Sequence, residues 1–349
     1  MELGTCVRMY NSIIIRVFKK GETMKTKNST KLHELPATRE TVSVGVIDRN
    51  MHPVIEVESG DEVLLETWTH WGDVVRPETT YEDFLKFRQM HRNPSYPNAG
   101  PHSLTGPIAV KGAKPGLALR VDILDICLRN HGYNVRLSGE SGRGLLPEDF
   151  PNGEIKHFTF DLQEMTTEFL PGIQIPLRPF LGIMAVAPPG SNPISSSTVG
   201  THGGNIDLTD LTVGSSLFLP VWKDGADFRT GDAHAVQGDG EVNLMAIETA
   251  FTSARLRFTV CERLTLRNPW AENPNHFITF GFGCDLQTAS KEAVREMISF
   301  LGKCFSLSPS EAYTLCSIAV DLSITQIVNP YVGVHAKLSR AIFDGGKYR

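Results

Sequence analysis

Two short segments of the chain gather histidines and carboxylates among glycines. They are "HGGNIDLTD" at residues 202–210 and "GDAHAVQGDGEV" at residues 231–242. In the second segment Asp232 and His234 stand two apart, so an extended backbone projects both side chains from one face. That spacing suits two ligands of one metal ion, or an acid–base pair oriented by a charge. The segments therefore predict carboxylate and imidazole chemistry, with a metal ion as its partner.

Asp232, His234 and Glu241 form the stronger candidate set. These three ionisable groups border predicted strands, and burying them costs free energy unless something compensates their charge. A metal-activated water that attacks a carbonyl is the economical reaction for such a set. Glu66 and His70, in "ETWTHW", share one face of a predicted strand, so they either join this site or belong to a solvated face.

The first segment and a loop near residue 100 supply weaker candidates. His202, Asn205 and Asp207 can close on the same centre, and His102 in "GPHSLTGP" is a further contribution. A lone histidine in such a loop is more often a hydrogen-bonded or surface residue than a ligand. Asp239 belongs to an Asp-Gly pair, which is a standard turn signal, so we interpret it as structural.

Other kinds of chemistry lack support in the sequence. There is no G-x-S-x-G elbow, and the serine run at residues 195–200 has no Lys or His at a recognised spacing. "GESGRG" at residues 139–144 leads into Leu-Leu-Pro rather than a helix, which excludes a phosphate-binding loop. A net charge of -5 offers no basic face to nucleic acid. The six cysteines lie in apolar surroundings without C-x-x-C spacing, which indicates unreactive thiols in a reducing, cytoplasmic compartment.

A β-rich pattern dominates the chain from Thr41 onward. A segment at residues 72–105 breaks the pattern and holds one predicted helix, Tyr81–Met90, in a Pro- and Asn-rich loop. Alternating or β-branched runs between Gly, Pro, Asn and Asp predict the strands. They lie at residues 41–47, 53–59, 62–70, 107–128 (two strands and a turn), 183–189, 216–222, 240–249, 254–260 and 322–329.

Two helices are predicted near the C-terminus. Apolar residues between positions 289 and 304 recur on one helical face. Ser308 and Glu311 form a capping box with Pro309 at the first helical position, which predicts a second helix to about residue 319. The predicted fold class is therefore mainly β, a β-rich α+β protein with a β-sandwich-like body and a helical hairpin near the C-terminus.

The length of the chain is enough to bury a large core. We expect residues 1–23 to be a disordered extension and residues 24–349 to form a β-rich catalytic domain, with a sub-boundary near residues 190–200. The apolar stretch "SIIIRVF" is too short and too interrupted to span a membrane.

Four segments together resemble the acetamidase/formamidase family. They are "GPHSLTGPIAVKGAKPG", "RPFLGIMAVAP", the long stretch from "HGGNIDLTD" through "GDAHAVQGDGEV", and "SPSEAYTLCSIAVDLSITQIVN". The resemblance runs in the same order from about Leu32 to Phe343 and is most specific between His202 and Val242.

The resemblance implies hydrolysis of a short linear amide, formamide or acetamide, to a carboxylate and ammonia. It also implies a β-rich fold, a homo-oligomer and a divalent metal, zinc in some members, with calcium as the alternative. Some relatives open γ-lactam rings, so a lactam substrate is one alternative. A second is a non-enzymatic β-rich binding module whose acidic loops a calcium ion only braces.

The family's motifs assign roles to residues of this chain. The Gly-Gly-Asn-x-Asp, Gly-Asp-x-His and Gly-Asp-Gly-Glu elements supply most of them. The predicted metal ligands are His202, Asp207, Asp232 and His234. The predicted substrate-binding residues are His102, Gly204 and Asn205. Glu241 is predicted to act as general base on the water and then as proton donor to the ammonia, with Asp232 and His234 as the other catalytic residues.

Overall fold

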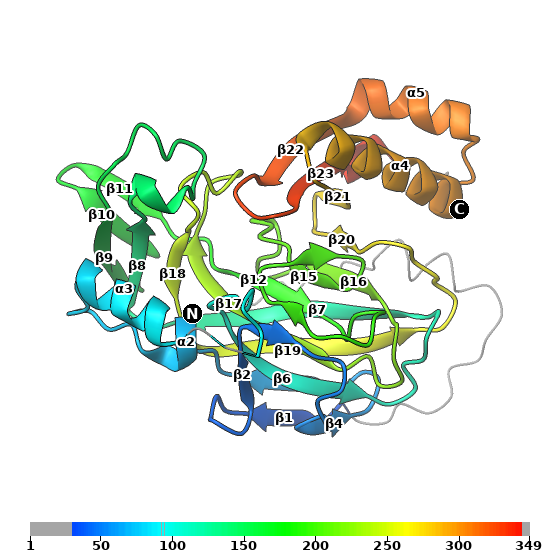
Figure 1. The fold of residues 1–349 in the computed structure, drawn as a ribbon. Coiled ribbons are helices and arrows are strands. Elements are labelled where there is room, and N and C mark those ends of the chain that lie inside the picture. The colour runs from blue at the N-terminus through cyan, green and yellow to red at the C-terminus, as the bar shows by residue number, and fades with distance from the viewer. Residues whose placement is uncertain (1–29, 92, 94, 344–349) are drawn as a thin grey trace, which may run out of the picture.

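The computed structural model describes residues 30–91, 93 and 95–343, and two large β-sheets hold most of their regular structure (Figure 1). The predicted extension at residues 1–23 lies outside this range. The first sheet has nine strands. In sheet order they are β1 (Leu32–Leu35), β5 (Glu62–Leu65), β19 (Phe251–Cys261), β7 (Ala118–Leu128), β16 (Ser216–Pro220), β20 (Trp270–Glu272), β21 (His276–Gly283), β23 (Val332–Ser339) and β22 (Val320–Gln326).

The second sheet has twelve strands and carries most of the candidate site. In order they are β11 (Ile173–Pro176), β10 (Thr166–Leu170), β9 (Glu154–Asp161), β8 (His131–Arg136), β18 (Ile247–Thr249), β17 (Phe228–Val236), β12 (Phe180–Ala185), β15 (Gly203–Asn205) and β14 (Val199–Gly200). Off this path, β6 (Ser103–Val110) pairs with β17, β2 (Val42–Val44) and β4 (Ile55–Val57). A separate pair joins β3 (Val46–Ile47) to β13 (Ile194–Ser195).

The main core lies between the two sheets, which makes the body a sandwich. Side chains alternate along a strand, so Leu119, Val121 and Ile123 of β7 are buried in alternation with half-buried residues. From the opposite sheet, Leu181 of β12 and Phe228 of β17 enter the same core. Apolar area removed from water on this scale is the main favourable contribution to folding. The β-rich α+β prediction with a sandwich-like body is confirmed.

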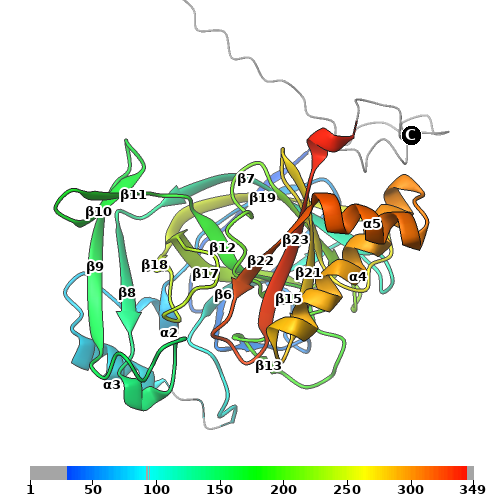
Figure 2. The same ribbon diagram turned by 90° about the horizontal axis from the view of Figure 1, so that it is seen from above.

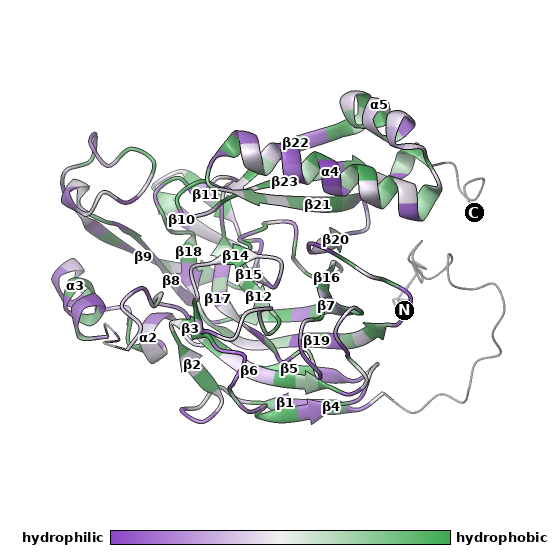
Figure 3. Cartoon of the chain, turned by 45° about the vertical axis from the view of Figure 1, so that its right-hand side comes forward, coloured by the Kyte–Doolittle hydropathy of each residue, from purple (hydrophilic) through white to green (hydrophobic). Residues whose placement is uncertain are grey.

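A second core joins the C-terminal helices to the outer strands of the first sheet. The helices are α4 (Leu286–Phe305) and α5 (Pro309–Ala319), and they lie together above β21–β23 (Figures 1 and 2). Met297, Phe300 and Leu301 of α4 are buried in this core, while both helices also carry hydrophilic stretches, as amphipathic helices do (Figure 3). In the part of the chain described, no helix is long and apolar enough to cross a membrane.

The predicted helix starts are confirmed. Ser308 accepts a hydrogen bond from Glu311 N, and the Glu311 side chain accepts one from Ser308 N, with Pro309 at the first helical position. The earlier helix α3 (Tyr81–Met90) has the predicted bounds. The remaining helical turns are α2 (His70–Asp73) and the 3₁₀ turns η1 (Gly139–Ser141) and η2 (Arg340–Ile342).

Several predicted strands have other bounds in the structure, and the two largest differences lie next to the candidate site. The strand predicted at residues 62–70 ends at Leu65, and His70 begins the turn α2. The strand predicted at 240–249 starts only at Ile247, because Gly240, Glu241 and Leu244 have positive φ and form a loop. Apolar composition made both stretches resemble strands, although tertiary contacts fix their conformations.

Packing of α4 on β21 depends on a glycine, which gives a stability prediction. A Cβ at Gly281 would overlap the Ala289 carbonyl oxygen, an atom of the helix backbone that cannot move alone. We expect Gly281→Ala to lower the free energy of unfolding by about 2–3 kcal/mol. Gly302 lies within α4, where a Cβ would meet Leu307 O at an ordinary 3.5 Å. Gly302→Ala should therefore raise the free energy of unfolding by up to about 1 kcal/mol. Urea unfolding of both variants checks the opposite signs; equal effects would contradict this packing.

Candidate active site

Asp232 and His234 meet in the middle of the second sheet, as their spacing predicts. Both are buried in β17, and His234 Nε2 lies 3.3 Å from Asp232 Oδ1. Asp232 has a φ of 56°, a left-handed conformation that aspartate tolerates better than most residues. Pairing with β12 continues on either side of it, at Gly231 and Ala233. The local distortion thus turns a carboxylate into the site without breaking the sheet.

His70 and His102 approach the same carboxylate from other elements. His70 Nε2 lies 3.7 Å from Asp232 Oδ1, and His102 Nε2 lies 3.8 Å from Asp232 Oδ2. The turn α2 is fastened to the start of β6, where Ser103 Oγ donates to Thr69 O and accepts from Gly72 N. That attachment explains why two histidines distant in sequence converge. His70 therefore joins the site, whereas the exposed Glu66 instead accepts a hydrogen bond from Ala37 N.

Each of these histidines has its other ring nitrogen held by a hydroxyl. His70 Nδ1 lies 3.2 Å from Tyr133 Oη, and His102 Nδ1 lies 2.8 Å from Ser196 Oγ. Ser196 thus has the histidine partner that sequence spacing did not reveal. Its side chain is completely buried, and Gly100 packs so closely that a Cβ there would overlap the Ser196 hydroxyl. This hydrogen bond orients the His102 ring.

Glu248 is a site residue that the sequence analysis missed. It lies in β18, where its Oε2 is 3.3 Å from His234 Nε2 and 3.7 Å from His70 Nε2. Its other oxygen accepts a hydrogen bond from Ala246 N. The available signal was a glutamate that closes the apolar run "NLMAI", because a carboxylate in such a run costs desolvation unless it is paired.

Charges in this cluster stabilise one another. Burial opposes ionisation of Asp232, but the imidazoles of His102 and His234 outweigh it and hold the Asp232 pKa well below its usual value. Burial also opposes a charged His234, yet Glu248 and Asp232 raise the His234 pKa well above its usual value. His102 is dominated by burial, which lowers its pKa to about 4. In the absence of a metal, the chain therefore holds His234 charged and His102 neutral at neutral pH.

Asp207 and Glu241 form a second carboxyl pair beside His234. Ligand atoms of the three residues all lie within 4.8 Å of one another. Both carboxyl residues have left-handed φ, 52° at Asp207 and 50° at Glu241. Burial, and then the charges of Glu241 and Asp232, raise the pKa of Asp207 well above its usual value. Burial and neighbouring carboxylates, against the lowering effect of His234, raise the pKa of Glu241 to about 8. Two such carboxyls hold a proton near neutrality.

The set fits a divalent cation. His70 Nε2 and Asp207 Oδ1 are buried without a hydrogen-bond partner among the described residues, and leaving such atoms unpaired costs about 1–3 kcal/mol each. Two imidazole nitrogens and a carboxylate oxygen are common ligands of zinc. Three groups of residues could each hold an ion, because within each group the ligand atoms all lie within 4.8 Å of one another. They are His70, His102 and Asp232; Asp207, His234 and Glu241; and Asp232, His234 and Glu248.

The remaining predicted site residues lie at the margin of these groups. His202 is buried but belongs to none of the three, and its Nε2 lies against Gly204, where a Cβ would come within 2.7 Å. Burial lowers the His202 pKa to about 4. Asn205 Nδ2 donates to Asp207 Oδ2 at 2.5 Å, and Gln237 Nε2 donates to Asp207 O. Asn205 therefore orients Asp207, and the metal and substrate roles of His202 and Gly204 stay predictions.

Gly182 of β12 forms the floor of the site. A Cβ there would lie 2.7 Å from Asp207 Oδ1, 2.8 Å from Asp232 Oδ2 and 2.9 Å from His234 Cε1. We expect Gly182→Ala to displace these groups and lower turnover about 10²-fold, the scale that a displacement of about 1 Å can cost. Gly200→Ala is the control, because its Cβ would meet His202 at an ordinary 3.6 Å. Steady-state kinetics of both variants test this prediction. Normal turnover in Gly182→Ala would contradict the close approach of Gly182 to the site residues.

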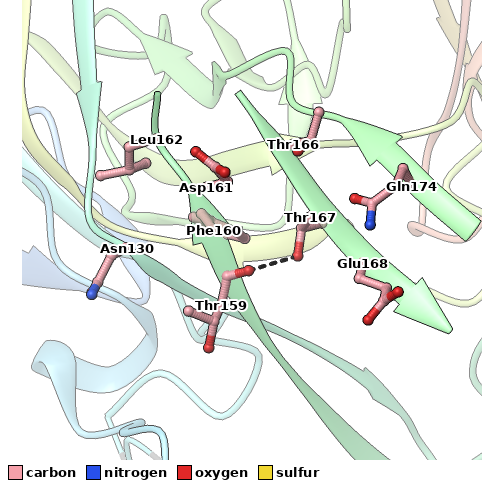
Figure 4. A pocket seen from close by; sticks show the side chains of 9 residues that line it. All are labelled: Asn130, Thr159, Phe160, Asp161, Leu162, Thr166, Thr167, Glu168 and Gln174. Atoms are coloured by element: carbon pink, nitrogen blue, oxygen red, sulfur yellow. Dashed lines mark hydrogen bonds between the residues drawn. The ribbon is translucent and has the colours of Figure 1, made fainter. Parts of the chain in front are cut away.

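A separate surface hollow of about 730 Å³ lies beside β9 and β10 (Figure 4). Its polar groups already serve local structure. Thr167 Oγ1 donates to Thr159 O, and Asp161 Oδ1 accepts from Gln163 N and Glu164 N. The hollow shares no residue with the histidine and carboxylate groups, and we assign no ligand to it.

Known proteins share both sequence and fold with this chain. The model of the acetamidase/formamidase family matches residues 47–199 and 190–345. A formamidase from Methylophilus methylotrophus is 28% identical over 263 residues, which is 59% of this chain and 62% of that protein. The chain matches between 49 and 62% of the length of its curated relatives.

Solved structures extend the likeness over nearly the whole chain. An acetamidase from Bacillus halodurans has a TM-score of 0.78 at 31% identity, covering 89% of this chain and 98% of that one. A γ-lactamase from Delftia acidovorans has a TM-score of 0.58 at 26% identity, and the match covers 87% of this chain and 90% of that one. The chain belongs to the acetamidase/formamidase family.

Proposed function

We propose that the protein hydrolyses a short linear amide, formamide or acetamide, to the carboxylate and ammonia. The observation that carries the proposal is the buried cluster of three histidines and four carboxyls in a chain of this family. His70, His102 and Asp232 would hold the metal. Two imidazoles in that set favour zinc over calcium, which prefers oxygen ligands. This choice replaces His202, Asp207 and His234 of the sequence-based ligand set with His70 and His102, whose Nε2 atoms lie 3.7 and 3.8 Å from the Asp232 carboxylate.

A divalent cation bound there would polarise the amide carbonyl and lower the pKa of a water molecule. With the shared proton of the pair on Asp207, the ionised Glu241 takes the proton from the attacking water and returns it to the departing nitrogen. A carboxyl whose pKa is about 8 exchanges protons readily near neutral pH. Asp207 beside it shares the proton between these steps.

His234 is proposed to bind the amide oxygen. Its Nε2 faces Asp232 and Glu248, and their charges keep the ring protonated. Its Nδ1 is buried and has no hydrogen-bond partner within the described chain. A protonated ring with one free N–H supplies a donor to an oxygen that gains negative charge during attack.

The proposal is tested by ammonia release from formamide, acetamide and propionamide and by ring opening of a γ-lactam, using protein purified without chelator. We expect turnover of formamide or acetamide and loss of turnover after metal removal. Turnover of the lactam alone would favour a ring-opening relative, assayed by ring opening because a lactam releases no ammonia. Metal binding without turnover of any amide would favour the binding module. Full activity in metal-free protein would remove the metal from the mechanism.

A further inference from the structure

The turn between β22 and β23 reaches from the strands beneath α4 and α5 to the candidate site. Both views show this turn extending back toward β12 and β17 (Figures 1 and 2). There it pairs with the loop that carries Glu241, since Gly240 N donates to Thr325 O and Ile327 N donates to Gly240 O, both at 3.1 Å. Gly240 has a φ of 101°, which favours glycine. These two bonds fix the backbone immediately before Glu241.

One buried side chain gives the turn its shape. Gln326 is fully buried, its Nε2 donates to Tyr331 O at 2.7 Å, and its Oε1 accepts from Asn329 N at 3.3 Å. The amide thus bridges both ends of a short loop. This bracing presents the Asn329 side chain to the second sheet.

Asn329 contacts a carboxylate of the site. Its Nδ2 donates to Asp207 Oδ2 at 3.4 Å, and the same oxygen accepts from Asn205 Nδ2 at 2.5 Å. The other oxygen, Asp207 Oδ1, lacks a partner among the described residues and faces Gly182. Two amides, one from β15 and one from the turn between β22 and β23, therefore hold one carboxyl oxygen and direct the other into the site.

We propose that Asn329 is a positioning residue for the amide hydrolysis, acting through Asp207. This inference rests on the proposed function. Within the described chain, Asp207 is the one site residue that the Asn329 side chain hydrogen-bonds. Removal of the Asn329 side chain therefore leaves the substrate-binding and metal-holding side chains in place. Without the Asn329 amide, Asp207 keeps one amide instead of two, and its carboxyl can rotate out of its place beside His234 and Glu241. The cost should therefore fall on the proton-transfer step, in kcat, more than on KM.

The test compares Asn329→Ala and Asn329→Asp on the amide that the wild-type protein turns over fastest. We expect kcat to fall about 10-fold in Asn329→Ala, and about 10²-fold in Asn329→Asp because a carboxylate then faces Asp207. KM should stay within about 3-fold in both. The matched controls are Asn152→Ala and Asn152→Asp, made at an exposed asparagine outside the site, which should keep wild-type kinetics. Thermal unfolding of all four variants confirms that they fold.

The outcomes separate this inference from the proposed function. Wild-type kcat in both Asn329 variants would overturn the positioning role while leaving the amidase assignment intact. A parallel rise in KM and fall in thermal midpoint would also overturn it, because loosening of the turn then explains the loss. No turnover of any amide by the wild-type protein would instead overturn the proposed function.

Discussion

Glu241→Gln is expected to lower kcat by about 10³-fold on whichever amide the protein hydrolyses, the scale of a lost general acid–base group. Glutamine keeps the volume and a hydrogen-bonding oxygen, but it can neither take a proton from water nor return one to nitrogen. His70, His102 and Asp232 are unchanged, so the bound metal should remain. Ammonia release measures the expected fall in kcat, and metal analysis of the same preparation checks that the metal is retained.

The control for this variant is Glu164→Gln, at an exposed glutamate of a β-turn, which should behave as wild type. Wild-type turnover in Glu241→Gln would remove Glu241 from the mechanism. Loss of both turnover and metal would instead assign Glu241 to the metal.

The same variant should change the pH dependence of stability in metal-free protein. Glu241 has its pKa raised from 4.5 to about 8 in the folded state. Between these values the folded protein holds a proton that the unfolded chain has released, so stability falls as pH rises through this window. Glutamine lacks this effect. The unfolding midpoint of Glu241→Gln should therefore exceed that of wild type increasingly from pH 5 to pH 9, as thermal scans can measure; parallel curves would contradict the raised pKa.

The second large effect is expected for Asp232→Asn. Three imidazoles, those of His70, His102 and His234, face this carboxylate at 3.3–3.8 Å. Asparagine fits the left-handed backbone at this position, so the fold should be retained. The neutral amide removes the anionic ligand from the histidine pair. We expect metal affinity to fall at least about 10²-fold and turnover about 10³-fold or more.

Metal content and ammonia release measure this prediction. Asp149→Asn, at an exposed position, is the matched control and should keep both. A variant with wild-type metal content would show that Asp232 is not a ligand. Retained turnover without metal would contradict the metal-dependent mechanism itself.

Much of this protein can be predicted from local sequence signals. The capping box at Ser308 and the apolar face of the preceding helix determined α5 and α4, because helix caps and periodicity act within a few residues. The spacing of Asp232 and His234 on one strand predicted that their side chains meet, and they do. The motifs from His202 to Val242 were specific enough to indicate the family.

Only the tertiary structure decided which other residues complete the site. His70 lies on a turn that the apolar pattern had assigned to a strand, and Asn329 lies in a run with no chemical signal of its own. The glutamate at the end of "NLMAI" did not show that Glu248 would lie beside His234. These residues meet because β17 pairs with β6, β12 and β18, and because the C-terminal hairpin docks on the Glu241 loop. Sequence periodicity reports which face of one strand a residue occupies. It carries no information on which distant strand or turn lies opposite that face, and that pairing determined the site.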